Sequence, residues 1–202
     1  MAGKMEKKNL IIVIVVAVSV LAFGALALLS GGKGGVLGTP TLTVETPQKC
    51  SAGEEITLDV TISDMGEALY PAASMSIRFD PACLEFLAVE EGNVFIRDDE
   101  SASGRQLPQW SYNTAVCNES GLINIMYLDM TGGRYAFSRQ LLAEEDNVVL
   151  RLTFRVRGSV RTGDVLDLIV EDAVFAASEE KDSLAMTRNT LRVRNSRIVI
   201  GE

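Results

Sequence analysis

The 202-residue sequence contains no histidine. This absence excludes Ser-His-Asp and Cys-His catalysis, and it excludes every zinc site that needs an imidazole ligand. Aromatic residues make up only 6% of the sequence, and Trp110 is the single tryptophan. Two positioned carboxylates would suffice for a glycosidase, but a cleft that cleaves sugars usually stacks several aromatic rings against its substrate. We therefore predict that the protein is not an enzyme.

The sequence also lacks a convincing metal site. Residues 99–104 begin like an EF-hand loop, but Trp110 occupies the twelfth position, where a bidentate glutamate is required. The spacing of Cys50, Cys83 and Cys117 matches no metal-ligand pattern. Three cysteines allow at most one disulfide, and the alternative is that all three are small buried hydrophobic side chains. We expect no metal and no other cofactor in this chain.

Charge is distributed unevenly along the chain. Four lysines and one glutamate give residues 1–33 a net charge of +3. Since the whole chain has a net charge of −8, residues 34–202 have a net charge of −11. An acidic body repels phosphate backbones, which argues against a nucleic-acid partner.

One hydrophobic run differs from everything else. Residues 10–29 carry no charge and follow three lysines. About twenty helical residues span roughly 30 Å, the thickness of the hydrocarbon core of a bilayer. Because positive flanks stay in the cytoplasm, we predict a cytoplasmic stub at 1–9, a transmembrane signal anchor at 10–29, a Gly-rich linker at 30–40 and an extracellular domain at 41–202.

An alternative for the same run is a cleaved signal peptide. The Ala-Leu-Ala sequence at 25–27 offers small residues for such a cleavage site. In that case the body would be secreted instead of remaining a single-pass protein of the cell membrane. The run is longer than the usual signal-peptide core, which favours the anchor.

Alternation of apolar and polar residues dominates the body. Segments of this kind predict strands at 41–45, 55–62, 74–79, 110–115, 122–128, 150–157, 166–173, 191–193 and 197–200. Turn residues separate them. The pattern predicts an all-β fold, a nine-stranded antiparallel β-sandwich of jelly-roll type, in one domain. Residues 136–145 alone have helical spacing, for a turn or two at most. Trp110 is expected to pack between the sheets.

A corner follows the third predicted strand. Asp80 precedes Pro81, which disfavours the helical region for Asp80 and ends the strand. The Asp80 side chain can also accept a hydrogen bond from the backbone two residues on. Leu84, Phe86 and Ala88 are then expected to return to the core. We assign Asp80 and Pro81 a structural role.

The same region resembles a known family. Residues 74–86, Ser-Met-Ser-Ile-Arg-Phe-Asp-Pro-Ala-Cys-Leu-Glu-Phe, and the Val-Glu-Glu-Gly turn at 89–92 resemble the signature of cohesin domains, the nine-stranded receptor modules of cellulosomes. The strand that ends in an acid at 123–129 and the strand at 148–156 are similar to later blocks of that family. The resemblance extends from Thr41 to Ile200.

The resemblance implies binding to dockerins, small calcium-loaded helical modules of secreted proteins, with the calcium carried by the dockerin. It implies a flat binding face built by the strands at 74–79, 110–115, 122–128 and 166–173. Alternation predicts which side chains of this face point outward, and these are the candidate partner-binding residues: Ser74, Ser76, Arg78, Asn124, Met126 and Leu128. Met126 and Leu128 form either a small apolar patch with a polar rim or two scattered surface hydrophobes.

The sequence departs from the best-known cohesins at three positions. Those proteins usually place Asn and Asp where Ala72 and Ser74 stand, and Tyr where Cys117 stands. The departure leaves the fold unaffected and bears on the dockerin specificity. The alternative function is a carbohydrate-binding or adhesive β-sandwich without a dockerin partner, which would require a row of exposed aromatic side chains.

Overall fold

The computed structural model describes residues 38–47, 49–66, 68–94, 108–139, 147–178 and 185–201. Nearly all of these belong to one compact unit, Thr39–Glu202. The predicted membrane anchor at 10–29 lies outside the described residues. No helix in the described ranges is long and apolar enough to cross a membrane.

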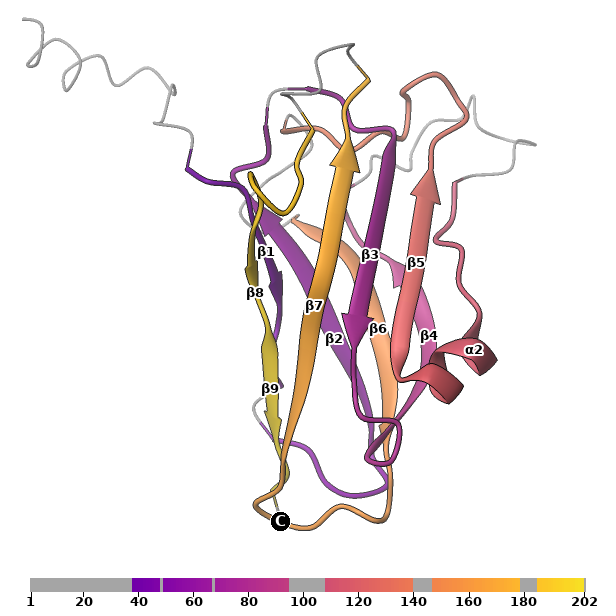
Figure 1. Ribbon diagram of the computed structural model, residues 1–202, viewed down its shortest axis with the longest axis vertical. Helices are drawn as coiled ribbons and strands as arrows, with labels where there is room; N and C mark the ends of the chain where they lie inside the picture. The colour runs from indigo at the N-terminus through magenta and orange to yellow at the C-terminus, as the bar shows by residue number, and fades with distance from the viewer. Residues whose placement is uncertain are drawn as a thin grey trace, which may run out of the picture. The chain divides into compact units, whose positions relative to one another are not determined.

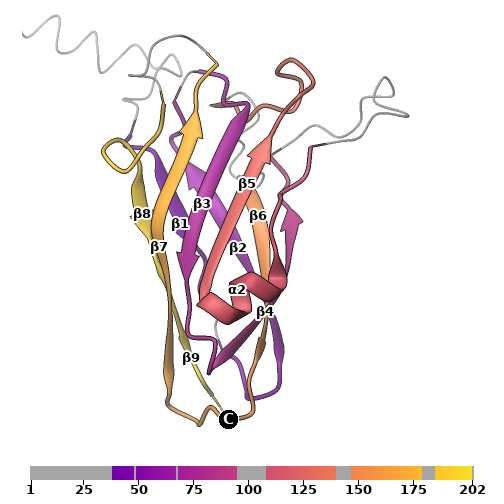
Figure 2. The same cartoon turned by 45° about the vertical axis from the view of Figure 1, so that its right-hand side comes forward.

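The described residues form nine strands in two sheets, which face each other as two layers (Figures 1 and 2). One sheet has five strands in the order β4-β6-β2-β1-β8, and the other has four in the order β5-β3-β7-β9. The strands are β1 Thr41–Val44, β2 Glu55–Ser63, β3 Ala72–Arg78, β4 Leu84–Glu91, β5 Leu122–Leu128, β6 Val148–Val156, β7 Val165–Ala176, β8 Arg192–Arg194 and β9 Ser196–Val199. The predicted β-sandwich is confirmed.

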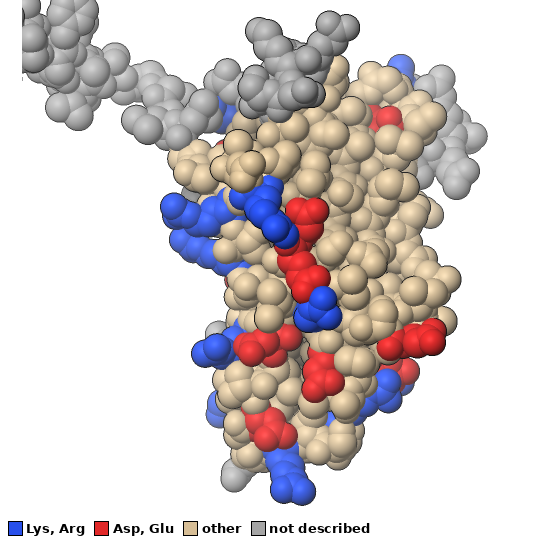
Figure 3. Space-filling model, in the orientation of Figure 1, with Lys and Arg blue, Asp and Glu red and all other residues tan. Residues whose placement is uncertain are grey.

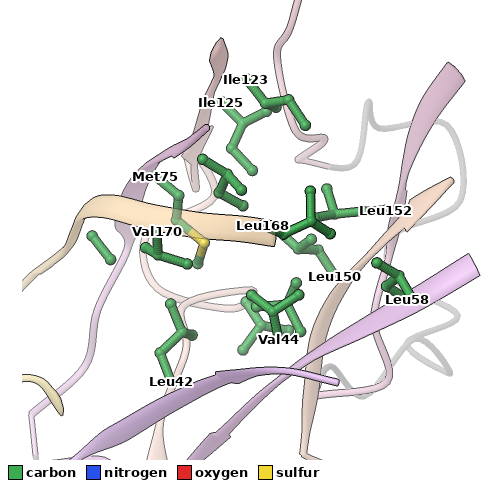
Figure 4. Close-up of a cluster of buried hydrophobic side chains, with 14 of the residues drawn as sticks. Leu42, Val44, Leu58, Met75, Ile123, Ile125, Leu150, Leu152, Leu168 and Val170 are labelled. Carbon is green, nitrogen blue, oxygen red and sulfur yellow. The ribbon is translucent and has the colours of Figure 1, made fainter. Parts of the chain in front are cut away.

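The core lies between the two sheets. Figure 4 shows aliphatic side chains from both layers meeting there, among them Leu58 of β2, Leu152 of β6, Met75 of β3 and Ile125 of β5. All four are at most 3% exposed. Each such burial contributes about 1.5–3 kcal/mol of transfer free energy. Because strand side chains alternate, this core also determines which side chains reach the two outer faces.

One neighbour pair contradicts the predicted antiparallel order. β1 pairs antiparallel with β2 on one side but parallel with β8 on the other. The two-residue period of side chains is the same for both directions, so the pattern could not distinguish them. A parallel pair needs a long connection, and here nearly the whole domain lies between β1 and β8.

The strand predicted at 110–115 is also wrong. Ser111 makes a single bridge to β5, and the chain then forms helix α2, Thr114–Ser120. The Asn113 side chain accepts a hydrogen bond from a backbone N–H of the first turn, and Gly121 ends the helix with a φ of 67°. Both are strong helix signals that override a short alternation. Trp110 itself is buried, as predicted.

β4 is a strand that the sequence analysis did not predict, and it brings the number of strands to nine. Its segment was expected only to return to the core. Leu84 and Phe86 are fully buried, as predicted. A shift of register between Phe86 and Ala88 leaves Ala88 half-buried, and Val89 packs against the core in its place. An extra residue in one strand reverses the alternation beyond it. Most of the predicted helical segment at 136–145 lies outside the described residues.

Helix α2 closes the free edge of β4 through one side chain. The Asn118 carboxamide accepts a hydrogen bond from the Phe86 N–H at 2.8 Å and donates one to the Phe86 carbonyl at 2.8 Å. Its amide group donates a third to the Thr114 carbonyl at 3.1 Å. The carboxamide thus replaces a neighbouring strand and prevents edge-to-edge pairing at this point.

Replacing Asn118 with alanine should lower the free energy of unfolding by about 1–3 kcal/mol, because it leaves both Phe86 backbone groups without their partner. The exposed neighbour Glu119 provides the control, and Glu119→Ala should change stability by less than about 0.5 kcal/mol. Urea denaturation of both variants measures the difference. Equal midpoints for the two variants would contradict the edge-closing role.

Candidate protein-binding face

The outer faces of the two sheets differ in where their charged side chains lie. On the five-stranded sheet, Arg155 contacts both Glu55 of β2 and Glu85 of β4, and Arg151 pairs with Asp59 at 3.0 Å. The charges over β2, β4 and β6 are thus arranged in cross-strand pairs in contact with water. Such a face is well solvated and offers a partner little apolar surface.

The four-stranded sheet presents three rows of outward side chains across β5, β3 and β7. The strand register sets their order. The rows are Leu128, Ala72 and Ala176; then Met126, Ser74 and Val174; then Asn124, Ser76 and Asp172. Neighbouring strands lie about 4.8 Å apart, so each row is about 10 Å wide.

Two of these rows are apolar apart from one hydroxyl. Met126 is 55% exposed and Leu128 is 48% exposed, although both are hydrophobic. Tyr127, which lies between them in the sequence, faces the core. In Figure 3, the surface over the middle and upper parts of β3 and β5 carries no Lys, Arg, Asp or Glu.

The six sequence-predicted residues all lie on this face. Ser74, Arg78, Asn124, Met126 and Leu128 are exposed and Ser76 is half-buried. The structure brings Ser74 and Met126 together as direct neighbours, and the Ser76 hydroxyl donates to Asn124 Oδ1 at 2.7 Å. Arg78 lies at the far end of β3, where it forms an ion pair with Glu171. The hydrogen bond and charge of Glu171 raise the pKa of Arg78, which stays charged.

The predicted face included the strand at 166–173, which is part of β7, but none of its side chains was among the six predicted residues. Plain alternation from Val165 would place Ala173 outward, but Ala173 is 3% exposed and Val174 takes the outer position. The cause is a bulge, seen as a register shift between Ser76 and Ile77 of β3 against β7. No residue of β7 signals this bulge in the sequence, so Asp172 and Val174 could be placed only from the structure.

Two further apolar side chains flank the upper end of the face. Leu69 precedes β3 and is 45% exposed, and Met130 follows β5 and is 82% exposed. The loop after β5 is held by buried Asp129, whose carboxylate accepts hydrogen bonds from the Thr131 N–H at 2.8 Å and the Tyr135 N–H at 3.2 Å. These bonds order the backbone of the loop that carries Met130.

Neither metal chemistry nor sugar stacking is supported at this face. In the part of the chain that the structure describes, no three Cys, Asp or Glu side chains gather in a way that could hold a metal ion. Among the exposed large hydrophobic side chains of the same ranges, Tyr112 is the one aromatic, at 37%. Its ring lies edge-on against Phe86.

The corner after β3 has the geometry that its sequence suggests. The Asp80 carboxylate accepts a hydrogen bond from the Ala82 N–H at 2.9 Å, and the Leu84 N–H donates to the Asp80 carbonyl at 2.9 Å. The Cys83 thiol donates to Asp80 Oδ2 at 3.3 Å. Cys50, Cys83 and Cys117 are all free thiols, and Cys50 and Cys117 are buried.

Together, the two sheets define a β-sandwich module in which one outer face carries cross-strand ion pairs over β2, β4 and β6, and the other has an uncharged, partly apolar area over β3 and β5. The sequence model of the cohesin domain matches residues 40–193. The chain therefore belongs to the cohesin family, a family of structural, non-catalytic modules.

Solved structures share this fold. One is the third ScaC cohesin of Acetivibrio cellulolyticus in complex with the ScaB dockerin, at 15% identity and a TM-score of 0.61, covering 81% of this chain and 99% of that chain. Another is the OlpA cohesin of Clostridium thermocellum in a cohesin–dockerin complex, at 18% identity and a TM-score of 0.60, with the same coverage of 81% and 99%. No curated protein sequence matches the chain.

The Asp80–Cys83 contact should slow the alkylation of Cys83. Burial, together with the hydrogen bond and charge of Asp80, raises the pKa of the Cys83 thiol. The reactive thiolate is therefore scarce near pH 8. Asp80→Asn removes the charge but keeps an acceptor for Ala82, so the pKa should fall and alkylation of Cys83 by iodoacetamide at pH 8 should become severalfold faster.

Peptide mass spectrometry over time measures this rate. Asp172→Asn, a matched change at another exposed aspartate, should leave the rate unaltered. An equal rate in Asp80→Asn and the unmodified protein would contradict the electrostatic link.

Proposed function

We propose that this protein binds a dockerin-bearing extracellular protein non-covalently through the outer face of β5, β3 and β7, as a scaffolding module of the cellulosome type. Support comes from the family of the chain and from solved cohesins such as those of ScaC and OlpA, each in complex with a dockerin. In this proposal the dockerin carries the calcium, and the chain described here contributes an apolar contact surface without catalysis.

The contrast between the two outer faces carries the choice of surface. On the five-stranded sheet, charged side chains such as Arg155 already have partners within the protein. On the four-stranded sheet, Met126, Leu128 and Val174 lie in adjacent rows with water on one side. A contiguous apolar patch with a polar rim is typical of a protein-binding surface.

The N-terminal segment supplies the proposed location. The uncharged run at 10–29 and its preceding lysines support a single-pass anchor, with the body displayed outside the cell. In this proposal the Gly-rich segment at 30–40 connects the anchor to the body. A partner bound to the body would then be retained at the cell surface.

The binding face is tested by placing a charge in its apolar part. Met126→Asp should weaken dockerin binding at least about a hundredfold, because an unpaired buried charge costs at least a few kcal/mol. Titration calorimetry against the calcium-loaded dockerins of the same organism measures the effect. Val199→Asp is the matched control, since Val199 is 50% exposed but lies on β9 at the other edge of the sheet, and it should bind normally.

Two results would contradict the proposal in different ways. If every dockerin fails to bind the intact body, the proposed function is wrong. If one binds and Met126→Asp has the same affinity as Val199→Asp, the function holds and the proposed face is wrong. Thermal unfolding of both variants verifies that each is folded.

The proposed location is tested by protease treatment of intact cells. Fragments of residues 41–202 should be released while the cells remain sealed, because the anchor places the body outside. Protection of the body until lysis would show the opposite orientation. A mature protein that begins near Leu28 and accumulates in the medium would show cleavage of the signal segment in place of anchoring.

A further inference from the structure

Basic residues are concentrated in one short part of an otherwise acidic body. Residues 185–201 contain four arginines and no Asp or Glu, a net charge of +4. Since residues 34–202 have a net charge of −11, the rest of the body carries −15. In Figure 3, Lys and Arg gather along the left edge, the side on which Figure 1 places β8 and β9. Charge is thus separated between one edge of the body and the remainder.

Two of these arginines have no charged partner. Arg192 and Arg194 are exposed on β8, the edge strand of the five-stranded sheet, outside the ion pairs over β2, β4 and β6. In the part of the chain that the structure describes, neither side chain forms an ion pair or a hydrogen bond. By contrast, Arg197 on β9 pairs with Asp167 at 3.2 Å. Val193 packs against the core, so the arginines on either side of it point outward.

The outer surface beside the two arginines carries hydroxyl groups and no charge. The strand register aligns Arg192 with Thr41 and Ser63, and Arg194 with Thr43 and Thr61. Hydroxyl and guanidinium groups both donate hydrogen bonds to phosphate and other anionic oxygens. The arrangement therefore suits a flat, anionic surface that is rich in oxygen acceptors.

The same edge lies where the chain enters the body. The Arg192 N–H donates to the Pro40 carbonyl at 2.7 Å, and Pro40 is the last residue of the Gly-rich segment at 30–40. Such a segment reaches at most about 40 Å when fully extended. With the run at 10–29 in a membrane, the two arginines are held within reach of the lipid headgroups, at an effective concentration in the millimolar range.

We propose that Arg192 and Arg194 dock this edge of the body onto the anionic lipid headgroups of the membrane that holds the anchor. The inference rests on the proposed location and adds an orientation to it. Each arginine near an anionic surface strengthens binding about fivefold, which is weak in free solution but sufficient for a tethered body. The acidic remainder of the body is repelled by the same surface. The outer face of β5, β3 and β7 belongs to the other sheet and stays accessible to a partner.

The inference is tested on the full chain in lipid nanodiscs, made either of phosphatidylcholine alone or of phosphatidylcholine mixed with anionic phosphatidylglycerol. Phenylglyoxal modifies accessible arginines, and peptide mass spectrometry over time gives a rate for each one. Arg192 and Arg194 should react at least about threefold more slowly in the anionic discs, because headgroups cover them. About 500 mM salt should remove the difference, since it shortens the screening length to a few ångströms.

Arg161 is the internal control for this experiment. It is exposed and has no ion pair among the described residues. It lies in the connection between β6 and β7, at the end of the body far from the entry of the chain (Figure 1). Its rate should be the same in both kinds of disc.

Two double variants provide an independent readout. In discs that contain a photoactivatable phosphatidylglycerol, the unmodified chain should cross-link through peptides of β1 and β8. Arg192→Gln/Arg194→Gln should lower the yield of these cross-links at least about threefold. Arg157→Gln/Arg161→Gln makes the same change of charge at two exposed arginines of the other end and should leave the yield unaltered. Thermal unfolding verifies that both variants are folded.

The possible failures are distinguishable. Equal modification rates of Arg192 and Arg194 in both kinds of disc would overturn the inference and leave these arginines the role of keeping an edge strand from pairing. Cross-links that persist in Arg192→Gln/Arg194→Gln would also overturn it. A chain that does not enter the discs would overturn the proposed location together with the inference. Dockerin titration needs no lipid, so its failure would contradict the proposed function and leave the docking of this edge standing.

Discussion

The burial of one side of every strand between two sheets is the constraint on which the rest of the structure depends. Once Met75, Ile125 and Tyr127 are committed to the core, the side chains beside them in the sequence must face water. The outward direction of the Met126 side chain is therefore set by its neighbours Ile125 and Tyr127, which lie on the opposite, buried side of the same strand. A change of strand register would exchange core and surface, so the core and the binding face are specified together.

The two outer faces differ in whether their outward side chains interact with one another within the protein. Cross-strand ion pairs such as Arg151 with Asp59 stabilise little at this exposure, but they keep one face solvated. The free edges are closed by side chains in a similar way: Asn118 bonds to β4, and Asn195 accepts from the Val170 N–H of β7 at 3.0 Å. On the other face, the apolar part is left without internal partners.

Sequence reasoning was successful wherever a single periodicity governed a whole strand. It placed the outward residues of β3 and β5 correctly, including Met126. It failed where a local feature interrupted the period: the bulges of β4 and β7, and the helix that Asn113 and Gly121 delimit. It also could not show that β1 runs parallel to β8, because direction leaves no trace in alternation. Val174, which lies opposite Ser74, was not predicted to face outward because of the bulge in β7.

The bridge between Ser111 and Met126 has a kinetic consequence. Both backbone groups of Met126 are bonded to Ser111, at 2.7 and 3.2 Å, while the strand that carries it is paired with β3 on the other side. The backbone at the centre of the face is thus already ordered before any partner arrives, and little conformational entropy is left to lose. Association should proceed as the meeting of two nearly rigid bodies, and partners of different affinity should differ mainly in how slowly they leave.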